Sequence, residues 1–367
     1  MRFKNPATAF MLFLMIYFIG INEIMAGIFM HSNAPRAVLS SLWFIIFIQL
    51  LNFIVPLFIW LAITKDTPEV LHGDGKSGFL STLWNTFKKH MPSQSLGFTN
   101  IVLIFLISIF LLPAMMLISA ISSLFVTNNA AELLMHFSAQ PWWLMMLAIA
   151  VTPGIVEEVV FRGYIQSVTK AKNFATIAIF NGFLFGVMHL SAHQFMYTFL
   201  LGIVFAYMVH ITRSIWAGIF SHFVLNGVNV TISHFAMRAY ETAGESMAEQ
   251  DLSAVYYMFA EADPDLALHL YEVVSNIRPE ILIIIVAAVF AAIATPIAAV
   301  FFKVFASYNR ERNEMIYPVE VKEEPAPFQV DWYLIVVVII FLAIVALPLL
   351  PIETNYNMYY NITTCYM

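Results

Sequence analysis

Long apolar runs dominate this sequence and limit what it can fold into. A helix needs about 20 consecutive apolar residues to cross the hydrocarbon core of a bilayer, which is about 30 Å thick. The sequence therefore predicts an all-α polytopic membrane protein with about nine transmembrane helices. Their expected ranges are 9–30, 38–64, 98–126, 142–169, 174–190, 195–211, 214–235, 280–304 and 332–350.

The composition excludes a water-soluble fold. Hydrophobic residues make up 61% of the chain and charged residues 11%, whereas soluble domains carry about 25% charged residues. So much apolar surface cannot be covered by polar groups, so lipid must be the main solvent. The single cysteine, Cys365, excludes a disulfide framework and a cysteine-based metal site. We expect membrane lipid as a partner and no nucleic acid.

Basic residues in the connections predict the orientation, because loops rich in Lys and Arg stay in the cytoplasm. With nine spans, every basic-rich stretch falls on one side. The N-terminus is then cytoplasmic and the C-terminus outside. These basic residues are Arg2, Lys4, Lys65, Lys76, Lys88, Lys89, Lys170, Lys172, Arg213, Lys303, Arg310, Arg312 and Lys322.

Several predicted spans carry ionisable side chains, which are costly in lipid and therefore indicate a functional site. Glu157 lies 13 residues before Lys170, and His189 lies 15 residues after Phe174. At 1.5 Å per residue these helical arms measure about 20 and 22 Å, so Glu157 and His189 should lie at the same depth.

A later span adds His222 and Asn226, whose i,i+4 spacing places them on one helix face. A carboxylate, two imidazoles and a carboxamide can therefore converge from three helices. Pro153-Gly154 precedes the acidic pair, and a proline bend there would open space beside Glu157.

This set of groups suits hydrolysis of an amide bond. A carboxylate and an imidazole can share a water molecule and take its proton. A second imidazole and a carboxamide N–H can stabilise an oxyanion. Glu158 and Arg162, also at i,i+4, can form an ion pair that supports the helix.

Three sequence motifs carry a family resemblance. Glu157-Glu158-Val159-Val160-Phe161-Arg162 resembles the EExxxR motif of the CAAX prenyl protease and bacteriocin-processing (CPBP, or Abi) membrane protease family. Phe185 to His189 resembles its FxxxH motif, and His222 to Asn226 resembles its third motif. The ordered set is specific, although each motif alone is weak. The resemblance covers about residues 141–232.

The resemblance implies that Glu157 and His189 activate water, that His222 and Asn226 form an oxyanion hole, and that Glu158 and Arg162 support them. It implies an intramembrane endopeptidase acting on a membrane-associated or lipidated peptide or protein. The chain then divides into N-terminal transmembrane helices (1–140), a catalytic transmembrane core (141–235), an extracytoplasmic amphipathic cap (236–279), and C-terminal helices with a tail (280–367). Within the cap, 252–259 and 266–274 are expected helices.

The resemblance leaves the metal question open, because the family is often described as metalloproteases. Glu157, His189 and His222 could supply a two-His-one-Glu zinc set, with water in the fourth position. Asn226 would then be surplus, since carboxamides are poor zinc ligands. The sequence favours a metal-independent glutamate mechanism with no cofactor.

Other interpretations of the same residues remain. Each intramembrane histidine taken alone is more often a packing residue, and Asn226 could simply join helices. The chain could be a proton-coupled transporter, which predicts inverted repeats that we do not find. It could also be an inactive scaffold or receptor of the same family, which predicts broken motifs, whereas these motifs are intact.

Overall fold

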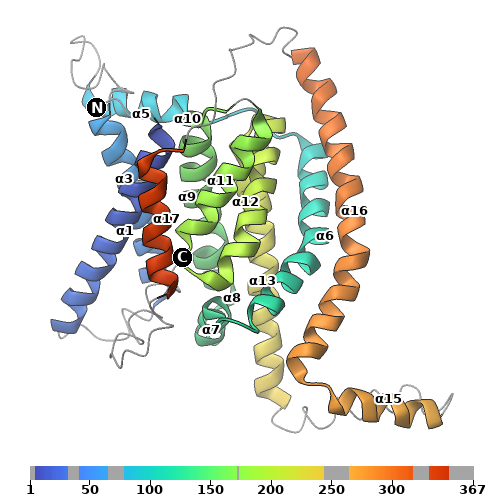
Figure 1. Ribbon diagram of the computed structural model, residues 1–367. Helices are drawn as coiled ribbons and strands as arrows, with labels where there is room; N and C mark the ends of the chain where they lie inside the picture. Colours follow the sequence, from blue (N-terminus) through green and yellow to red (C-terminus); the bar gives the residue numbers. More distant parts are fainter. Residues whose placement is uncertain are drawn as a thin grey trace.

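The computed structural model of the protein describes residues 5–31, 41–64, 78–171, 173–243, 264–316 and 330–346. In these ranges the regular elements are all helices, and most run side by side in one bundle (Figure 1). Seven helical segments of the described chain are long and apolar enough to cross a membrane, and two shorter apolar helices accompany them. Each predicted span therefore corresponds to an apolar helix, and the predicted all-α polytopic class is confirmed, whereas the count of nine spans and the orientation stay predictions.

The spanning helices are α1 (Pro6–His31), α3 (Leu42–Ile63), α6 (Phe98–Ser122), α12 (Ala192–Thr212), α13 (Ile215–Ala243) and α16 (Pro279–Ile316), together with the composite segment Trp142–Val168. The shorter apolar helices are α11 (Phe174–Met188) and α17 (Trp332–Ala346). Three further helices are α5 (Phe79–Lys89), α7 (Asn129–His136) and α15 (Pro264–Asn276).

Two spanning helices extend well past the residues at which the sequence predicted that they end. The helix α13 continues past residue 235 to Ala243, and α16 continues past residue 304 to Ile316. A helix that leaves the lipid does not have to stop at the surface, so the end of an apolar run need not be the end of a helix. Of the two predicted cap helices, 266–274 lies within α15, and 252–259 lies outside the described residues.

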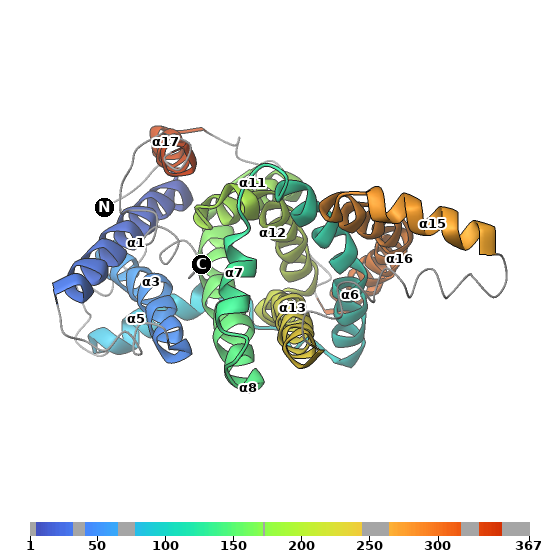
Figure 2. The same cartoon turned by 90° about the horizontal axis from the view of Figure 1, so that it is seen from below.

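The composite segment occupies the middle of the bundle. It consists of α8 (Trp142–Met145), the π-helix η1 (Met146–Val151), α9 (Thr152–Glu158), the π-helix η2 (Val159–Ile165) and α10 (Gln166–Val168). In Figures 1 and 2, α11, α12 and α13 lie next to it, α6 and α16 pack together on one side, and α1 and α17 lie on the other. The acidic pair Glu157-Glu158 therefore ends a short α-helix in the bundle interior.

The irregular helix around Pro153 has a local cause. Proline lacks the N–H that would bond the carbonyl of Ile149 four residues earlier. That carbonyl accepts a hydrogen bond from Asn226 Nδ2 at 3.1 Å instead. Nearby, Ala148 O accepts from Gln49 Nε2 at 2.9 Å. The predicted disturbance at Pro153 thus takes the form of a π-helix whose carbonyls bond side-chain amides from neighbouring helices.

Glycines allow α11 and α12 to approach closely. A Cβ added to Gly202 would lie 2.6 Å from the Cα of Gly182, so neither position has room for a side chain. Small residues permit such helix contacts in membranes, where the hydrophobic effect does not drive association. The tight α11–α12 pair fixes the end of α11, where His189 lies.

Candidate active site

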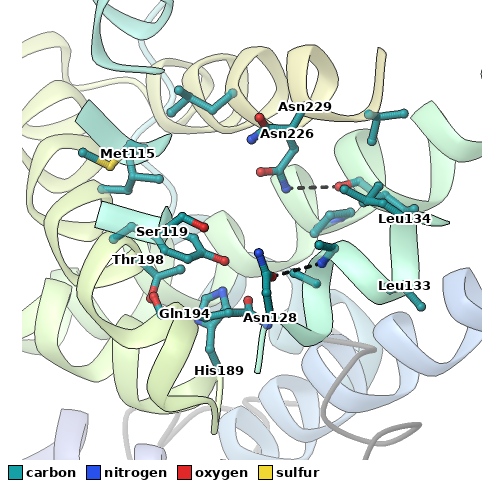
Figure 3. Close-up of a pocket in the computed structure, with 18 of the residues that line it drawn as sticks. Met115, Ser119, Asn128, Leu133, Leu134, His189, Gln194, Thr198, Asn226 and Asn229 are labelled. Carbon is teal, nitrogen blue, oxygen red and sulfur yellow. Dashed lines mark hydrogen bonds between the residues drawn. The ribbon is translucent and has the colours of Figure 1, made fainter. Parts of the chain in front are cut away.

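The four side chains predicted to converge all line one cavity. Its volume is about 510 Å³, and Glu157, His189, His222 and Asn226 form part of its wall. They come from the end of α9, the residue after α11, and two adjacent turns of α13. Figure 3 shows His189 and Asn226 on different sides of the same space. The predicted convergence is therefore observed, while the catalytic roles of these residues stay predictions.

Glu157 is buried, and one of its carboxylate oxygens is not bonded. The residue is 4% exposed, and its Oε2 atom has no hydrogen-bond partner among the described residues. Glu157 also lines a small gap together with Phe53, Phe161, Met188 and His189. A buried carboxylate oxygen normally has a partner. Glu157 Oε2 is therefore a buried acceptor that the described residues leave unused.

A hydrogen bond to the backbone determines which ring nitrogen of His189 carries the hydrogen. Its Nδ1 donates to the carbonyl oxygen of Phe185 at 2.8 Å. Since a carbonyl can only accept, Nδ1 carries the hydrogen, and the neutral ring has its lone pair on Nε2. His189 is 8% exposed and lines the cavity. Its second nitrogen is thus left to accept a proton.

Glu158 contacts two side chains, the cationic Arg162 and the ionisable His222. Arg162 Nη1 lies 3.0 Å from Glu158 Oε1, so the predicted ion pair is confirmed. His222 Nδ1 lies 3.1 Å from the same oxygen. The second contact could not be read from the sequence, because 64 residues separate the two positions.

Arg162 is fully enclosed by polar and aromatic groups. Its Nη2 donates to Gly202 O at 3.1 Å. The guanidinium carbon lies 4.3 Å from the ring centre of Phe185 and 5.2 Å from that of Phe205. Arginine is attracted to aromatic faces at these distances. The first residue of the FxxxH motif therefore packs on the last residue of the EExxxR motif.

The same rings surround both histidines. Phe185 contacts His189 edge to face, with ring centres 4.8 Å apart, and approaches His222 at 6.0 Å. Phe205 stacks on His222 at 5.4 Å. Rings held by such contacts and by one hydrogen bond each have little freedom to turn. The imidazoles are therefore preorganised.

The cavity wall includes polar residues that sequence reasoning missed. Gln194 is 4% exposed, lines the cavity, and has no hydrogen-bond partner at Nε2 among the described residues. Tyr197 and Asn128 also line it. Gln194 and Tyr197 belong to the first turns of α12, which begins at Ala192, whereas the sequence placed that helix start at residue 195. No pattern in the sequence singles them out.

The zinc alternative named for Glu157, His189 and His222 has mixed support. Among the described residues, no group of three His, Cys, Asp or Glu side chains is arranged to hold one metal ion. The Nδ1 atom of His222 bonds Glu158, which leaves Nε2 as the ring nitrogen that a metal would contact. The preference for a mechanism without a metal stays a prediction.

Comparisons with known proteins agree with the motifs. Residues 139–228 match the family of type II CAAX prenyl endopeptidase Rce1-like proteins. Over 116 residues the chain is 29% identical to the protein of Bacillus subtilis (strain 168) named "Putative membrane peptidase YdiL". That alignment covers 31% of this chain and 46% of the relative. No solved structure matches the chain with significance.

Both comparisons are with membrane proteases, and the family match spans all three motifs. The alignment with the curated relative covers less than half of that protein and about a third of this chain. The helices α1, α3, α16 and α17 lie outside residues 139–228, which match the family.

Proposed function

The central segment of this chain is of the CAAX prenyl protease family, and from that premise we propose that the protein is an intramembrane endopeptidase. Its substrate would be a membrane-associated peptide or protein, with or without an attached lipid, in the plasma membrane of a prokaryote. The observation that supports this most is one buried cavity lined by Glu157, His189, His222 and Asn226. Among the described residues, Glu157 Oε2 has no hydrogen-bond partner.

The nucleophile would be a water molecule held by Glu157 and His189. The Glu157 carboxylate would accept one hydrogen of that water, and His189 would accept the other at Nε2, since its Nδ1 bonds Phe185 O. As the water oxygen attacks the carbonyl carbon of the peptide, one of these acceptors takes its proton. A tetrahedral intermediate with a negative oxygen results.

His222 and Asn226 would stabilise that oxygen. His222 would act in its doubly protonated form, in which Nδ1–H bonds Glu158 and Nε2–H is left for the oxyanion. The Asn226 carboxamide has two N–H donors, and one is used by Ile149 O. The other is left for the substrate. Removing one such donor from an oxyanion hole typically lowers the rate by about 10²–10³.

Collapse of the intermediate completes the reaction. The C–N bond breaks as the proton taken from water passes to the leaving nitrogen. The products are a carboxylic acid and an amine, and Glu157 and His189 return to their starting states. No change of oxidation state is involved.

We propose that this mechanism needs no metal. Glu157 and the histidines do not meet at one point that would suit zinc, and the chain offers a base and oxyanion donors without it. The two other functions considered, a proton-coupled transporter and an inactive scaffold, gain no specific support from the cavity.

The test is proteolysis by the purified protein in lipid vesicles. A mixed peptide library is incubated with the protein, and mass spectrometry identifies any cleaved bond. The Glu157→Gln variant should lose activity while the bundle stays folded. Glu132→Gln is the matched control, because Glu132 is exposed at the start of α7 and is not part of the cavity wall. Full activity in Glu157→Gln would exclude the mechanism.

A further inference from the structure

The cavity lies toward one end of the bundle. Its wall is built from the early turns of α3, the first half of α12, the late turns of α6, the middle of α13, the segment around α7, and the first turns of α16. These parts gather at the lower end in Figure 1. Ser123, after the last turn of α6, and Glu280, in the first turn of α16, are exposed and mark the rim.

Tryptophans lie near the same end. Trp43, Trp142 and Trp143 are 57%, 41% and 57% exposed, and they stand at the first turns of α3 and α8. Trp142 Nε1 donates to Thr231 Oγ1, late in α13. Tryptophan is enriched where the bilayer meets water. The cavity rim is therefore close to a membrane surface.

Basic residues gather at the opposite end. Arg312 Nη2 donates to Ser95 O at 2.7 Å, and Arg213 O accepts from Gln94 N at 3.1 Å. The first bond joins the last turns of α16 to the connection between α5 and α6. The second joins the turn before α13 to the same connection. The described basic side chains at this end are Lys88, Lys89, Lys170, Arg213, Arg310 and Arg312. Two arginines lie at the cavity end. Arg278 forms an ion pair with Glu280 at 3.4 Å, and Arg238 lies near the end of α13.

We propose that the active-site cavity opens to the extracytoplasmic side. Connections rich in Lys and Arg stay in the cytoplasm, and the cavity opens at the end that is poor in them. The substrate would then be a peptide segment exposed outside the cytoplasmic membrane, such as the flank of an exported or membrane-anchored chain. The identification of this substrate rests on the proposed protease function, whereas the direction of opening does not.

The cavity wall further limits the substrate. Among the described residues, its lining has no Lys, Arg or Asp, and the carboxylates in it are Glu157 inside and Glu280 at the rim. Most of the wall is apolar, with uncharged polar groups such as Asn128 and Gln194. An amide N–H donor without a partner, such as Gln194 Nε2, can donate a hydrogen bond to a carbonyl oxygen of a bound peptide. The residues next to the cleaved bond should therefore be apolar or uncharged, and acidic residues should be excluded.

Thiol labelling tests the direction of opening without any need for activity. The single cysteine is removed by Cys365→Ser, and Ser123→Cys or Glu280→Cys places a thiol at the rim. Lys170→Cys, exposed at the basic end, is the matched control. Intact cells are treated with a charged maleimide that cannot cross membranes, and a second sample is permeabilised first.

We expect the rim cysteines to react in intact cells and Lys170→Cys to react only after permeabilisation. The reverse pattern would overturn the proposal. Rim cysteines that react in neither sample, but do react after denaturation, would also overturn it, because the rim would then be closed.

A second measurement separates this proposal from the proposed function. A bulky maleimide on Ser123→Cys should lower proteolysis roughly a hundredfold, as expected when substrate can no longer be positioned. The same reagent on Lys170→Cys should leave the rate unchanged. If no variant cleaves any peptide but the rim still reacts from outside, the protease function fails and the direction of opening stands.

Discussion

His222 Nδ1 lies 3.1 Å from Glu158 Oε1, and Arg162 Nη1 lies 3.0 Å from the same oxygen. The neighbouring Glu157 forms no ion pair with the described residues, and it lines the cavity. Each glutamate keeps an Oε2 atom without a hydrogen-bond partner among the described residues, so the difference between them lies in the ion pairs of Glu158. We propose that Glu158 has the supporting task and that Glu157 carries the chemistry.

The two glutamates should respond oppositely to the same substitution. Glu158→Gln leaves the buried Arg162 without its carboxylate, and breaking a buried ion pair costs about 3–5 kcal/mol. Its unfolding temperature in detergent should fall clearly. Glu157→Gln removes a buried carboxylate that forms no ion pair with the described residues, so its unfolding temperature should stay or rise. Equal losses in the two variants would contradict the assignment.

The double variant Glu158→Gln/Arg162→Met gives the control. It removes the cation together with its partner, so no buried charge is left over. Replacing both members of a buried pair is often nearly neutral. We expect it to unfold at a higher temperature than Glu158→Gln, although the orientation of His222 and the activity would not return.

Much of the fold could be predicted from the sequence, because the requirement for about 20 apolar residues per span is strict. The nine predicted ranges all correspond to apolar helices. The convergence of Glu157 and His189 followed from helix rise alone, since both are counted from the same hairpin turn. The Glu158–Arg162 pair followed from its i,i+4 spacing, and the ion pair is present.

Contacts between helices could not be predicted in this way. The sequence does not show how each helix is rotated, so it did not reveal that His222 contacts Glu158 or that Asn226 caps the carbonyl of Ile149. Gln194 was missed for a different reason. It lies in a first helical turn that the apolar pattern assigned to a connection.

A pair of variants can separate the two tasks of Asn226. Asn226→Leu leaves Ile149 O without a donor, and an unbonded buried carbonyl costs about 1–3 kcal/mol. Adding Pro153→Ala restores the N–H that the carbonyl lacks. We expect thermal unfolding of the double variant to recover toward that of the parent protein. Activity should stay low, because the oxyanion donor is still missing. Recovery of both stability and turnover would mean that Asn226 serves only the backbone.

Two glycines of α13 should differ in their tolerance of alanine. A Cβ on Gly218 would lie 2.5 Å from Glu158 Oε2, and that carboxylate is fixed by Arg162 and His222. Overpacking of this kind costs about 1–3 kcal/mol. We expect Gly218→Ala to lower both the unfolding temperature and the rate of peptide cleavage.

Gly227→Ala is the matched control on the same helix. Its Cβ would lie 2.9 Å from Met146 Cε, the end of a flexible side chain that can move. Stability and activity should change little. If Gly218→Ala were equally harmless, Glu158 would not be held as tightly as its contacts indicate.

Chelation tests the proposal that no metal takes part. Glu157 and His189 already provide acceptors for a water molecule, and the described side chains offer no three-ligand site. Treatment of the purified protein with phenanthroline should therefore leave cleavage of the peptide library unchanged. Metal analysis should find well under one zinc per chain. Activity that is lost on chelation and restored by added zinc would reverse this conclusion, and Glu157, His189 and His222 would then be the ligands to substitute first.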